Sequence, residues 1–422
     1  MSLWKKAWGA LSKNSGLPDL PSCLEDELLL CAATARPNGE TVARMRSLLQ
    51  RETDWKRLLA AAREHRLAPL LYACLESSCA GLVPQSVLTE LGRRSILNCA
   101  RNRSLTAELV RILALFENHG VAALPLKGPL LAESIYGDIA LREFDDLDIL
   151  VPESKLAEAE RLLRKEGYQA PLHVPQHRLR SYRRMKHEIP YRHPGKSILI
   201  ELHWKISPVF FQFPMDMERL WSRAGWTALA GSRVRTLSKE DTLLILCARG
   251  SRHFWKKLEW VGALAGLISA HREMNWKYIF DQARDFRSER ALLLGLLMAH
   301  NLFGAEIPEP ARQRIRKDEV LCTLAAEAQR RLFIPNPQPV SAMEQCFHTA
   351  SLTDRWQDGL RIILRTLLLP QYDDWICFNL PACFVFLYYP IRMFRLLRKY
   401  TTPSLIPNYC RGIFSRLPKM IQ

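Results

Sequence analysis

The sequence lacks any pair of cysteines spaced as C-x-x-C, and its eleven cysteines are scattered and odd in number. Such usage favours reduced thiols in a reducing compartment and argues against a structural zinc site. The basic first residues are not followed by an apolar run of the kind that a secretory signal needs. We therefore expect no signal peptide and a cytoplasmic location.

No apolar stretch reaches the ~20 residues that a membrane-spanning helix needs. The most apolar one, residues 376–391, is interrupted by Asn379, Pro381 and Pro390. We predict a buried helical hairpin there and no transmembrane segment.

What the chain has in excess is positive charge. It carries 60 lysines and arginines against 43 acidic residues, for a net charge of +17. Such a molecule attracts polyanions, whether nucleoside triphosphates, nucleic acid or an anionic membrane face, and charge alone does not choose among them. With 422 residues, 48% of them hydrophobic, the chain can bury a sizeable core in two or three compact units.

The spacing of apolar residues changes twice along the chain. Before residue 120 and after residue 238 they recur at helical intervals, whereas strand-like runs alternate with helices in between. This order predicts an α+β fold with a small mixed-sheet core between N-terminal and C-terminal all-helical regions. Within the first region, residues 104–119 read as one helix that starts at Ser104 and stops at Gly120. The predicted units are an N-terminal extension, a helical cap, the core, a helical domain and a C-terminal helical tail, at residues 1–24, 25–120, 121–237, 238–334 and 340–422.

Two aspartates mark the segment with the clearest chemistry. In REFDDLDILVP, residues 142–152, Asp146 and Asp148 are two apart at the entry of a predicted strand, so their side chains share one face. Two such carboxylates can share Mg²⁺, which binds a few carboxylate oxygens together with water and substrate phosphates. Asp145 has the opposite parity and is expected to point away. A D-x-D triplet also arises by chance about once in a chain of this size, and a solvated turn is the alternative.

Polar residues on both sides of this segment support a metal site. Lys127 and Gly128 end an apolar run just before a helix, where backbone N–H groups and the positive helix end can hold phosphate. Glu201 and His203 share one face of a later strand, and Glu201 could complete the metal site or accept a proton from the acceptor. The alternatives are a salt-bridged strand residue and a structural histidine. Arg142 is a candidate for nucleotide binding or for capping the turn.

A basic segment precedes the strand that carries Glu201. Residues 177–196, HRLRSYRRMKHEIPYRHPGK, are rich in arginine and lysine. Arg183 and Arg184 are expected to clamp a triphosphate or an anionic acceptor, and Tyr182 and Tyr191 could stack on a base. The alternative is an exposed basic hairpin.

The segments LKGPLLAESIY, LREFDDLDILV and ELHW follow one another in the order helical cap, core and helical tail. They resemble the uncharacterised nucleotidyltransferases of bacteria, within the DNA polymerase β-like superfamily, over about residues 25–400. The aspartate segment is the most specific part of the resemblance. One departure is the phosphate-binding turn, which is usually Gly-Ser or Gly-Gly but is Lys-Gly here, followed by Pro129 with no backbone donor.

The resemblance implies a set of site residues. Asp146 and Asp148 would bind Mg²⁺ or Mn²⁺, Glu201 would be the third carboxylate, and Lys127-Gly128 would stand for the phosphate-side glycine motif. Because two like charges on one strand face repel, we also expect that Asn in place of either aspartate leaves the metal-free stability equal or slightly higher.

Such a site predicts transfer of a nucleoside monophosphate from a Mg²⁺-bound NTP to an acceptor hydroxyl or phosphate, with release of pyrophosphate. A small molecule, a peptide and RNA all stay open as the acceptor. One alternative is a catalytically silent module of the same fold that binds RNA, a peptide or a protein. A weak peripheral membrane contact through the basic C-terminal segment is compatible with either function.

Overall fold

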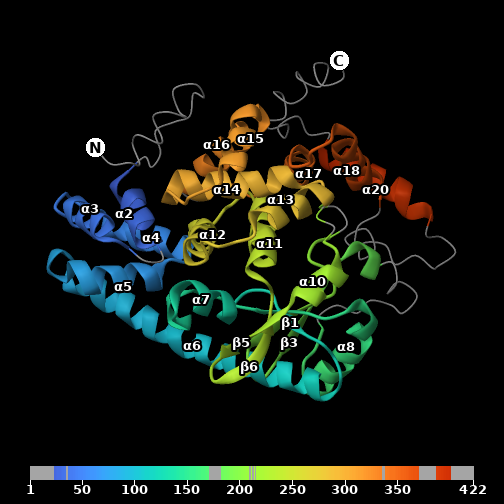
Figure 1. The fold of residues 1–422 in the computed structure, drawn as a ribbon, viewed down its shortest axis with the longest axis horizontal. Helices are drawn as coiled ribbons and strands as arrows, with labels where there is room; N and C mark the ends of the chain where they lie inside the picture. Colours follow the sequence, from blue (N-terminus) through green and yellow to red (C-terminus); the bar gives the residue numbers. More distant parts are fainter. Residues whose placement is uncertain are drawn as a thin grey trace.

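The structure is a computed structural model that describes residues 23–34, 37–170, 182–208, 211, 213, 215–334, 338–369 and 386–400. A small mixed sheet is enclosed by many helices, which confirms the predicted α+β class (Figure 1). The predicted N-terminal extension, the first part of the basic segment, much of the 335–339 linker and most of the 376–391 hairpin lie outside the described residues. No described helix combines the length and the apolar character needed to cross a membrane.

The regular structure of the N-terminal region is entirely helical. Some of its helices begin at polar capping residues that the sequence pattern indicates. Asp54, for example, accepts a hydrogen bond from the backbone of Arg57 and begins one helix there. The longest helix, α6, begins at Gln85, so the predicted start at Ser104 is wrong and Ser104 lies inside it. The elements are α2 (Leu24–Ala32), α3 (Gly39–Leu49), α4 (Trp55–Glu64), α5 (Ala68–Cys79), η1 (Ala80–Leu82) and α6 (Gln85–Asn118).

The central sheet has the strand order β1-β2-β4-β3. The middle pair, β2 and β4, is parallel, and each of the two outer pairs is antiparallel. The strands are β1 (Leu124–Pro125), β2 (Leu147–Leu150), β3 (Glu188–His193) and β4 (Ile198–His203). The connecting helices are α7 (Pro129–Tyr136), η2 (Ile139–Leu141), η3 (Glu153–Lys155) and α8 (Leu156–Lys165).

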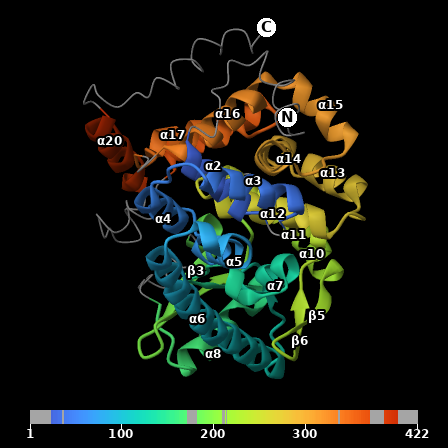
Figure 2. The same ribbon diagram turned by 90° about the vertical axis from the view of Figure 1, so that its left-hand side faces the viewer.

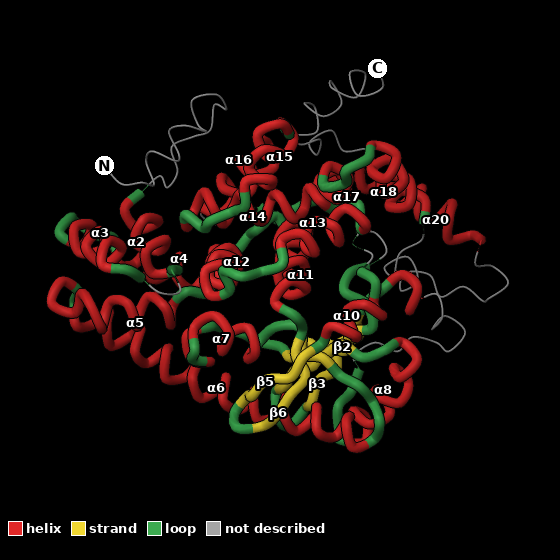
Figure 3. The backbone as a smooth tube through the Cα atoms, viewed as in Figure 1, coloured by secondary structure: helices red, strands yellow, loops and turns green. Residues whose placement is uncertain are grey.

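The two faces of this sheet differ because side chains alternate along a strand. One face is apolar and packs on α6 and α8, with Leu147, Ile149, Ile200 and Leu202 buried in a shared cluster. Figure 3 shows the strands gathered beside these helices. The other face carries the acidic residues and faces the C-terminal helices.

The C-terminal region begins with α10 (Met217–Arg223) and a separate hairpin of β5 (Gly225–Leu229) and β6 (Ser232–Thr236). Ser238 then caps the next helix by accepting a hydrogen bond from the backbone of Asp241. The helices are α11 (Lys239–Arg252), α12 (Leu258–Ala270), α13 (Trp276–Asp285), α14 (Glu289–Phe303), α15 (Glu309–Lys317), α16 (Glu319–Phe333), α17 (Ala342–Ser351), α18 (Trp356–Leu368) and α20 (Tyr388–Tyr400).

The helices before the sheet and those after it share one hydrophobic core. Buried residues of α2 to α5 and of α11 to α16 belong to the same cluster, and the turn after α2 contacts α12 at Gly262. Figure 2 shows the N-terminal helices lying across α12. Segments that are far apart in sequence therefore form one body around the polar face of the sheet.

Buried polar contacts fix the loop that leads into β2. The Nδ2 atom of Asn102 donates to the carbonyls of Ile139 and Arg142, at 2.6 and 2.7 Å. The Arg142 side chain in turn donates through Nε to Glu259 of α12 at 2.6 Å, with both side chains buried. Asp145 pairs with Arg66, in the turn between α4 and α5, and with Arg101 of α6, each at 2.5 Å. Asp145 is thus held away from the polar face of the sheet.

Candidate active site

Strand pairing brings the predicted acidic residues side by side. In the parallel ladder Asp148 of β2 lies opposite Glu201 of β4, and in the antiparallel ladder Glu188 of β3 lies opposite His203. Residues directly opposite one another project on the same face, and so do residues two apart on one strand. The register therefore gathers these four side chains on the polar face.

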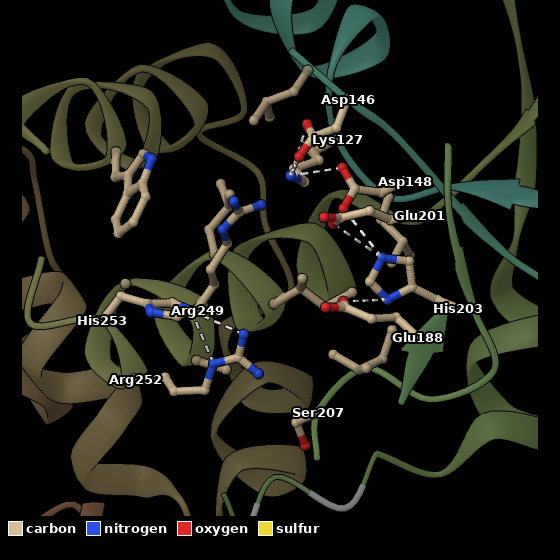
Figure 4. Close-up of a pocket in the computed structure, with 18 of the residues that line it drawn as sticks. Lys127, Asp146, Asp148, Glu188, Glu201, His203, Ser207, Arg249, Arg252 and His253 are labelled. Atoms are coloured by element: carbon tan, nitrogen blue, oxygen red, sulfur yellow. Dashed lines mark hydrogen bonds and ion pairs between the residues drawn. The ribbon is translucent and has the colours of Figure 1, made fainter. Parts of the chain in front are cut away.

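His203 stands at the centre of this group. Its Nε2 atom is 3.2 Å from Oδ1 of Asp148 and 3.8 Å from Oε2 of Glu201, while Nδ1 is 3.4 Å from Oε2 of Glu188 (Figure 4). Asp148 and His203 are each only 5% exposed. The ligand-type atoms of Asp148, Glu201 and His203 lie within 4.8 Å of one another.

Lys127 lies between the two aspartates. Its Nζ atom is 3.2 Å from Oδ1 of Asp146 and 2.7 Å from Oδ2 of Asp148. The chain can place it there because the backbone N–H of Leu126 donates to the carbonyl of Asp148, which aligns this segment with β2. Gly128 then turns the chain with φ +69°, a conformation that a residue with a side chain rarely adopts. Asp146 therefore joins the group through an ammonium bridge.

The charges of this group compensate one another. Burial alone would raise the pKa of Asp148, but the Lys127 ammonium and the hydrogen bond with His203 hold it well below its ordinary value. Burial alone would lower the pKa of His203, but the hydrogen bond with Asp148 and the charge of Glu188 raise it. The cluster thus holds Asp148 as a carboxylate and favours the charged form of His203.

Glu201 behaves differently from its neighbour on β2. Burial, followed by the negative charges of Asp148 and Glu188, raises the pKa of Glu201 to about 7. Its carboxyl group is therefore close to half protonated at neutral pH. A cation that binds here would displace that proton.

These contacts offset the expected repulsion within the aspartate pair. The Lys127 ammonium bridges Asp146 and Asp148, and His203 adds a second partner for Asp148. Removing the charge of Asp148 would leave both partners less compensated in a buried place. We therefore expect Asp148→Asn to lower the stability of the metal-free protein, contrary to the expectation from sequence.

A basic wall faces the acidic group across a cavity of about 260 Å³. Arg249 and Arg252 reach it from the end of α11, together with His253 (Figure 4). Neither arginine forms an ion pair with a carboxylate of the described chain. Burial and the nearby guanidinium groups lower the pKa of His253 to about 2, which keeps it neutral. Trp260 completes this wall, with the Arg249 guanidinium 5.4 Å from its ring centroid.

Sequence patterns missed the two arginines of this wall and two residues next to it. Arg249 and Arg252 are three apart on an ordinary helix, and nothing local distinguishes them from surface arginines. Glu188 and His187 lie in the basic segment, where the arginines are the more prominent feature of the sequence. The alternation of strand residues was the one available signal, because Glu188 begins the strand that pairs with β4.

The remaining predicted residues lie at different distances from the acidic group. Arg142 lines the cavity, but its Nε is committed to Glu259. Arg183 pairs with Glu160 of α8 at 3.3 Å, and Arg184 is exposed. Neither of these two is among the described residues that line the cavity. The structure thus brings together Asp146, Asp148, Glu201, His203 and Lys127, places Arg183 beside α8 and leaves Arg184 exposed outside the cavity lining.

The acidic group fits a hard divalent cation. The Oδ2 atom of Asp148 is buried and makes no hydrogen bond in the described structure, although Lys127 lies close to it. With the nearby carboxylate of Glu201 it offers oxygen ligands of the type that Mg²⁺ and Mn²⁺ prefer.

The comparison with known protein families agrees with this chemistry. The family model described as uncharacterised nucleotidyltransferase matches residues 51–304, more than half of the chain. The match runs from the N-terminal helices through the sheet to α14, so it includes both walls of the cavity. No curated protein matches the chain.

Substitution of Lys127 tests the ammonium bridge. Without its charge, Asp146 and Asp148 lose a competitor for cations, so Lys127→Met should bind Mn²⁺ about tenfold more tightly in the absence of nucleotide. The same variant should be less stable without metal, by about 1–3 kcal/mol, because Asp148 keeps only His203 as a partner. Calorimetric Mn²⁺ titration and urea unfolding measure the two effects. Lys127→Arg, which keeps the charge, is the matched control, and an unchanged Mn²⁺ affinity in Lys127→Met would rule out competition.

The raised pKa of Glu201 predicts a pH dependence of stability. Between pH 4.5, the ordinary pKa, and about 7, the folded protein binds more protons than the unfolded chain. The metal-free protein should therefore lose stability as the pH rises through this window, on the order of 2 kcal/mol from this group. Glu201→Gln should flatten that part of the profile, whereas Glu52→Gln at an exposed site should not. Equal slopes for wild type and Glu201→Gln would contradict the assignment.

Proposed function

This chain belongs to the family of uncharacterised nucleotidyltransferases, and we propose that it transfers a nucleoside monophosphate from a Mg²⁺-bound or Mn²⁺-bound NTP to an acceptor hydroxyl or phosphate. Pyrophosphate is the second product. The family match supports nucleotidyl transfer in general. The metal, the nucleotide and the class of acceptor are parts of the proposal.

One observation carries the proposal: uncompensated arginines face a cluster of carboxylates across a single cavity. A metal-bound triphosphate needs both surfaces, because its phosphates carry several negative charges while its metal seeks oxygen ligands. Arg249 and Arg252 form no ion pair with a carboxylate of the described chain, so their charge is available to an anion. Asp148 and Glu201 stand on the opposite wall.

The residues can be given roles on this basis. Asp146, Asp148 and Glu201 would hold the divalent cation, which when bound withdraws charge from the transferring phosphoryl group. Arg249 and Arg252 would bind the two phosphates that leave, and the Trp260 ring offers a surface for the base. When the nucleotide binds, the Lys127 ammonium would exchange its contacts with the aspartates for contacts with the triphosphate, because the triphosphate carries the larger negative charge.

The transfer itself exchanges one bond for another. The acceptor oxygen forms a bond to the α-phosphorus, the bond from that phosphorus to the bridging oxygen breaks, and pyrophosphate leaves with that oxygen. The proton of an acceptor hydroxyl passes to a base on the acidic wall. The Glu188 carboxylate lies next to His203 and can receive this proton directly or through water.

The finer assignments belong to the same proposal. The neighbouring β2 and β4 strands, with Asp148 beside Glu201, support membership of the DNA polymerase β-like superfamily. A bacterial source rests on the resemblance of the sequence segments alone, and a cytoplasmic location on the scattered cysteines. The acceptor remains one of a small molecule, a peptide and RNA.

The ammonium bridge also supports a second candidate function. A module that binds RNA, a peptide or a protein without catalysis would need an internal cation to stabilise its buried aspartates, and Lys127 supplies one. The two functions differ in whether pyrophosphate is released.

Substitution of Asp148 separates the two candidate functions. Asp148→Asn should reduce pyrophosphate release from the preferred NTP by about 10³-fold, because it removes a metal ligand and a buried charge. Asp145→Asn is the matched control: that side chain faces Arg66 and Arg101, and its loss should leave the rate within about threefold. The measurement is labelled-pyrophosphate release with each of the NTPs, Mg²⁺ or Mn²⁺ and a cell extract as the source of acceptor. Absence of release by the wild type under all these conditions would favour the silent module.

Substitution of Arg249 tests the basic wall. Arg249→Gln should weaken binding of the Mg²⁺-nucleotide at least about tenfold, since a charge-assisted hydrogen bond to phosphate is worth ~1.5–3 kcal/mol. Arg184→Gln tests the earlier hypothesis that the basic segment holds the triphosphate. The measurement is calorimetric titration with a non-hydrolysable NTP analogue. A loss in Arg184→Gln and none in Arg249→Gln would place the triphosphate at the basic segment.

A further inference from the structure

Exposed apolar side chains gather on two helices at the C-terminal end of the described chain. Of the thirteen large hydrophobic residues that are exposed among those the structure describes, eight lie on or beside α18 and α20. On α18 they recur every four residues and form one stripe. The residues of this stripe line a shallow groove. The eight are Trp356, Leu360, Leu364, Leu368, Phe386, Tyr389, Met393 and Phe394.

The two helices are packed as one unit. Arg392 of α20 is buried, and its Nε donates to the carbonyls of Thr366 and Leu367 at the end of α18, at 3.2 and 3.1 Å. Figure 1 shows α18 and α20 adjacent at one end of the molecule, with the sheet elsewhere. The apolar residues are therefore held on a formed surface outside the candidate active site.

The charges of this region are predominantly positive. On α18 the acidic residue Asp358 is 2% exposed and is paired with Arg361 and Arg287, and α20 has no acidic residue. From residue 356 to the end, the sequence has nine lysines and arginines against three aspartates and no glutamate. Arg361 and Arg365 lie next to the stripe on α18.

We propose that the face formed by α18 and α20 docks on the surface of an anionic lipid bilayer. A helix that lies in the interface combines an apolar face with aromatic residues and a basic polar face, and both helices have this composition. The charge excess matches anionic headgroups. The apolar stripe inserts at the level of the headgroups, and the helices lie along the membrane without crossing it.

The same charges disfavour a second copy of the chain as the occupant. A symmetric dimer through this face would bring two basic surfaces together, and each chain carries a net charge of +17. An anionic surface removes that repulsion and also accepts the apolar residues.

The test uses the full chain and vesicles of phosphatidylcholine alone or mixed with phosphatidylglycerol in about a 7:3 ratio. The wild type should co-sediment with the anionic vesicles and not with the neutral ones, and high salt should weaken binding. The double variant Leu360→Glu with Leu364→Glu should lose about tenfold in vesicle affinity, because it charges the stripe. The matched control, Ile96→Glu with Leu97→Glu, changes the net charge equally at exposed apolar positions of α6 and should bind as the wild type.

Three outcomes would overturn the proposal. The first is wild type that stays in the supernatant with anionic vesicles at low salt. The second is an equal loss of vesicle affinity in both double variants. The third is a dimer in sedimentation velocity that the α18 variant abolishes, without vesicle binding by the wild type. Thermal melting confirms that both double variants fold. If the α18 double variant does not fold, Trp356→Ser, at the exposed start of the stripe, replaces it with the same expected loss.

Discussion

The parallel pairing of β2 with β4 is the constraint on which the candidate active site depends. Its register sets Asp148 beside Glu201, and the pairing of β3 with β4 sets Glu188 beside His203. A shift of one residue would turn these side chains into the apolar cluster on α6 and α8. The apolar residues of the same strands prevent that shift, because they are buried on the opposite face. The hydrophobic packing of one face thus fixes the chemistry of the other.

Burial of the acidic group creates a need for positive charge, and the fold meets it from within. Lys127 comes from the segment that follows β1, and His203 comes from β4 itself. Their charges keep Asp148 ionised, whereas Glu201 has no comparable partner and retains its proton up to about neutral pH. A divalent cation and its nucleotide would replace this internal compensation. The site without ligand thus contains opposing charges that a bound cation and nucleotide would replace.

The helical regions determine what the sheet faces. One hydrophobic core joins helices from both ends of the chain, and it positions α11 so that Arg249 and Arg252 end at the cavity. The buried contact between Arg142 and Glu259 ties α12 to the loop before β2. The walls of the cavity are therefore parts of one packed body. The face formed by α18 and α20 lies at its margin, where it can contact a membrane without blocking the cavity.

The sequence by itself determined the fold class, the strand that carries Asp148 and the shared faces of Asp146 with Asp148 and of Glu201 with His203. Each follows from local periodicity, which needs no partner segment. The predicted start of α6 is wrong because Ser104 resembles an N-cap locally, whereas the helix continues through it and Asn102 donates through Nδ2 to carbonyls of a distant loop. Only the tertiary structure decided the β2–β4 register, the ammonium bridge of Lys127 and the arginines of α11. These are contacts between residues far apart in the chain, and no local pattern records which segments meet.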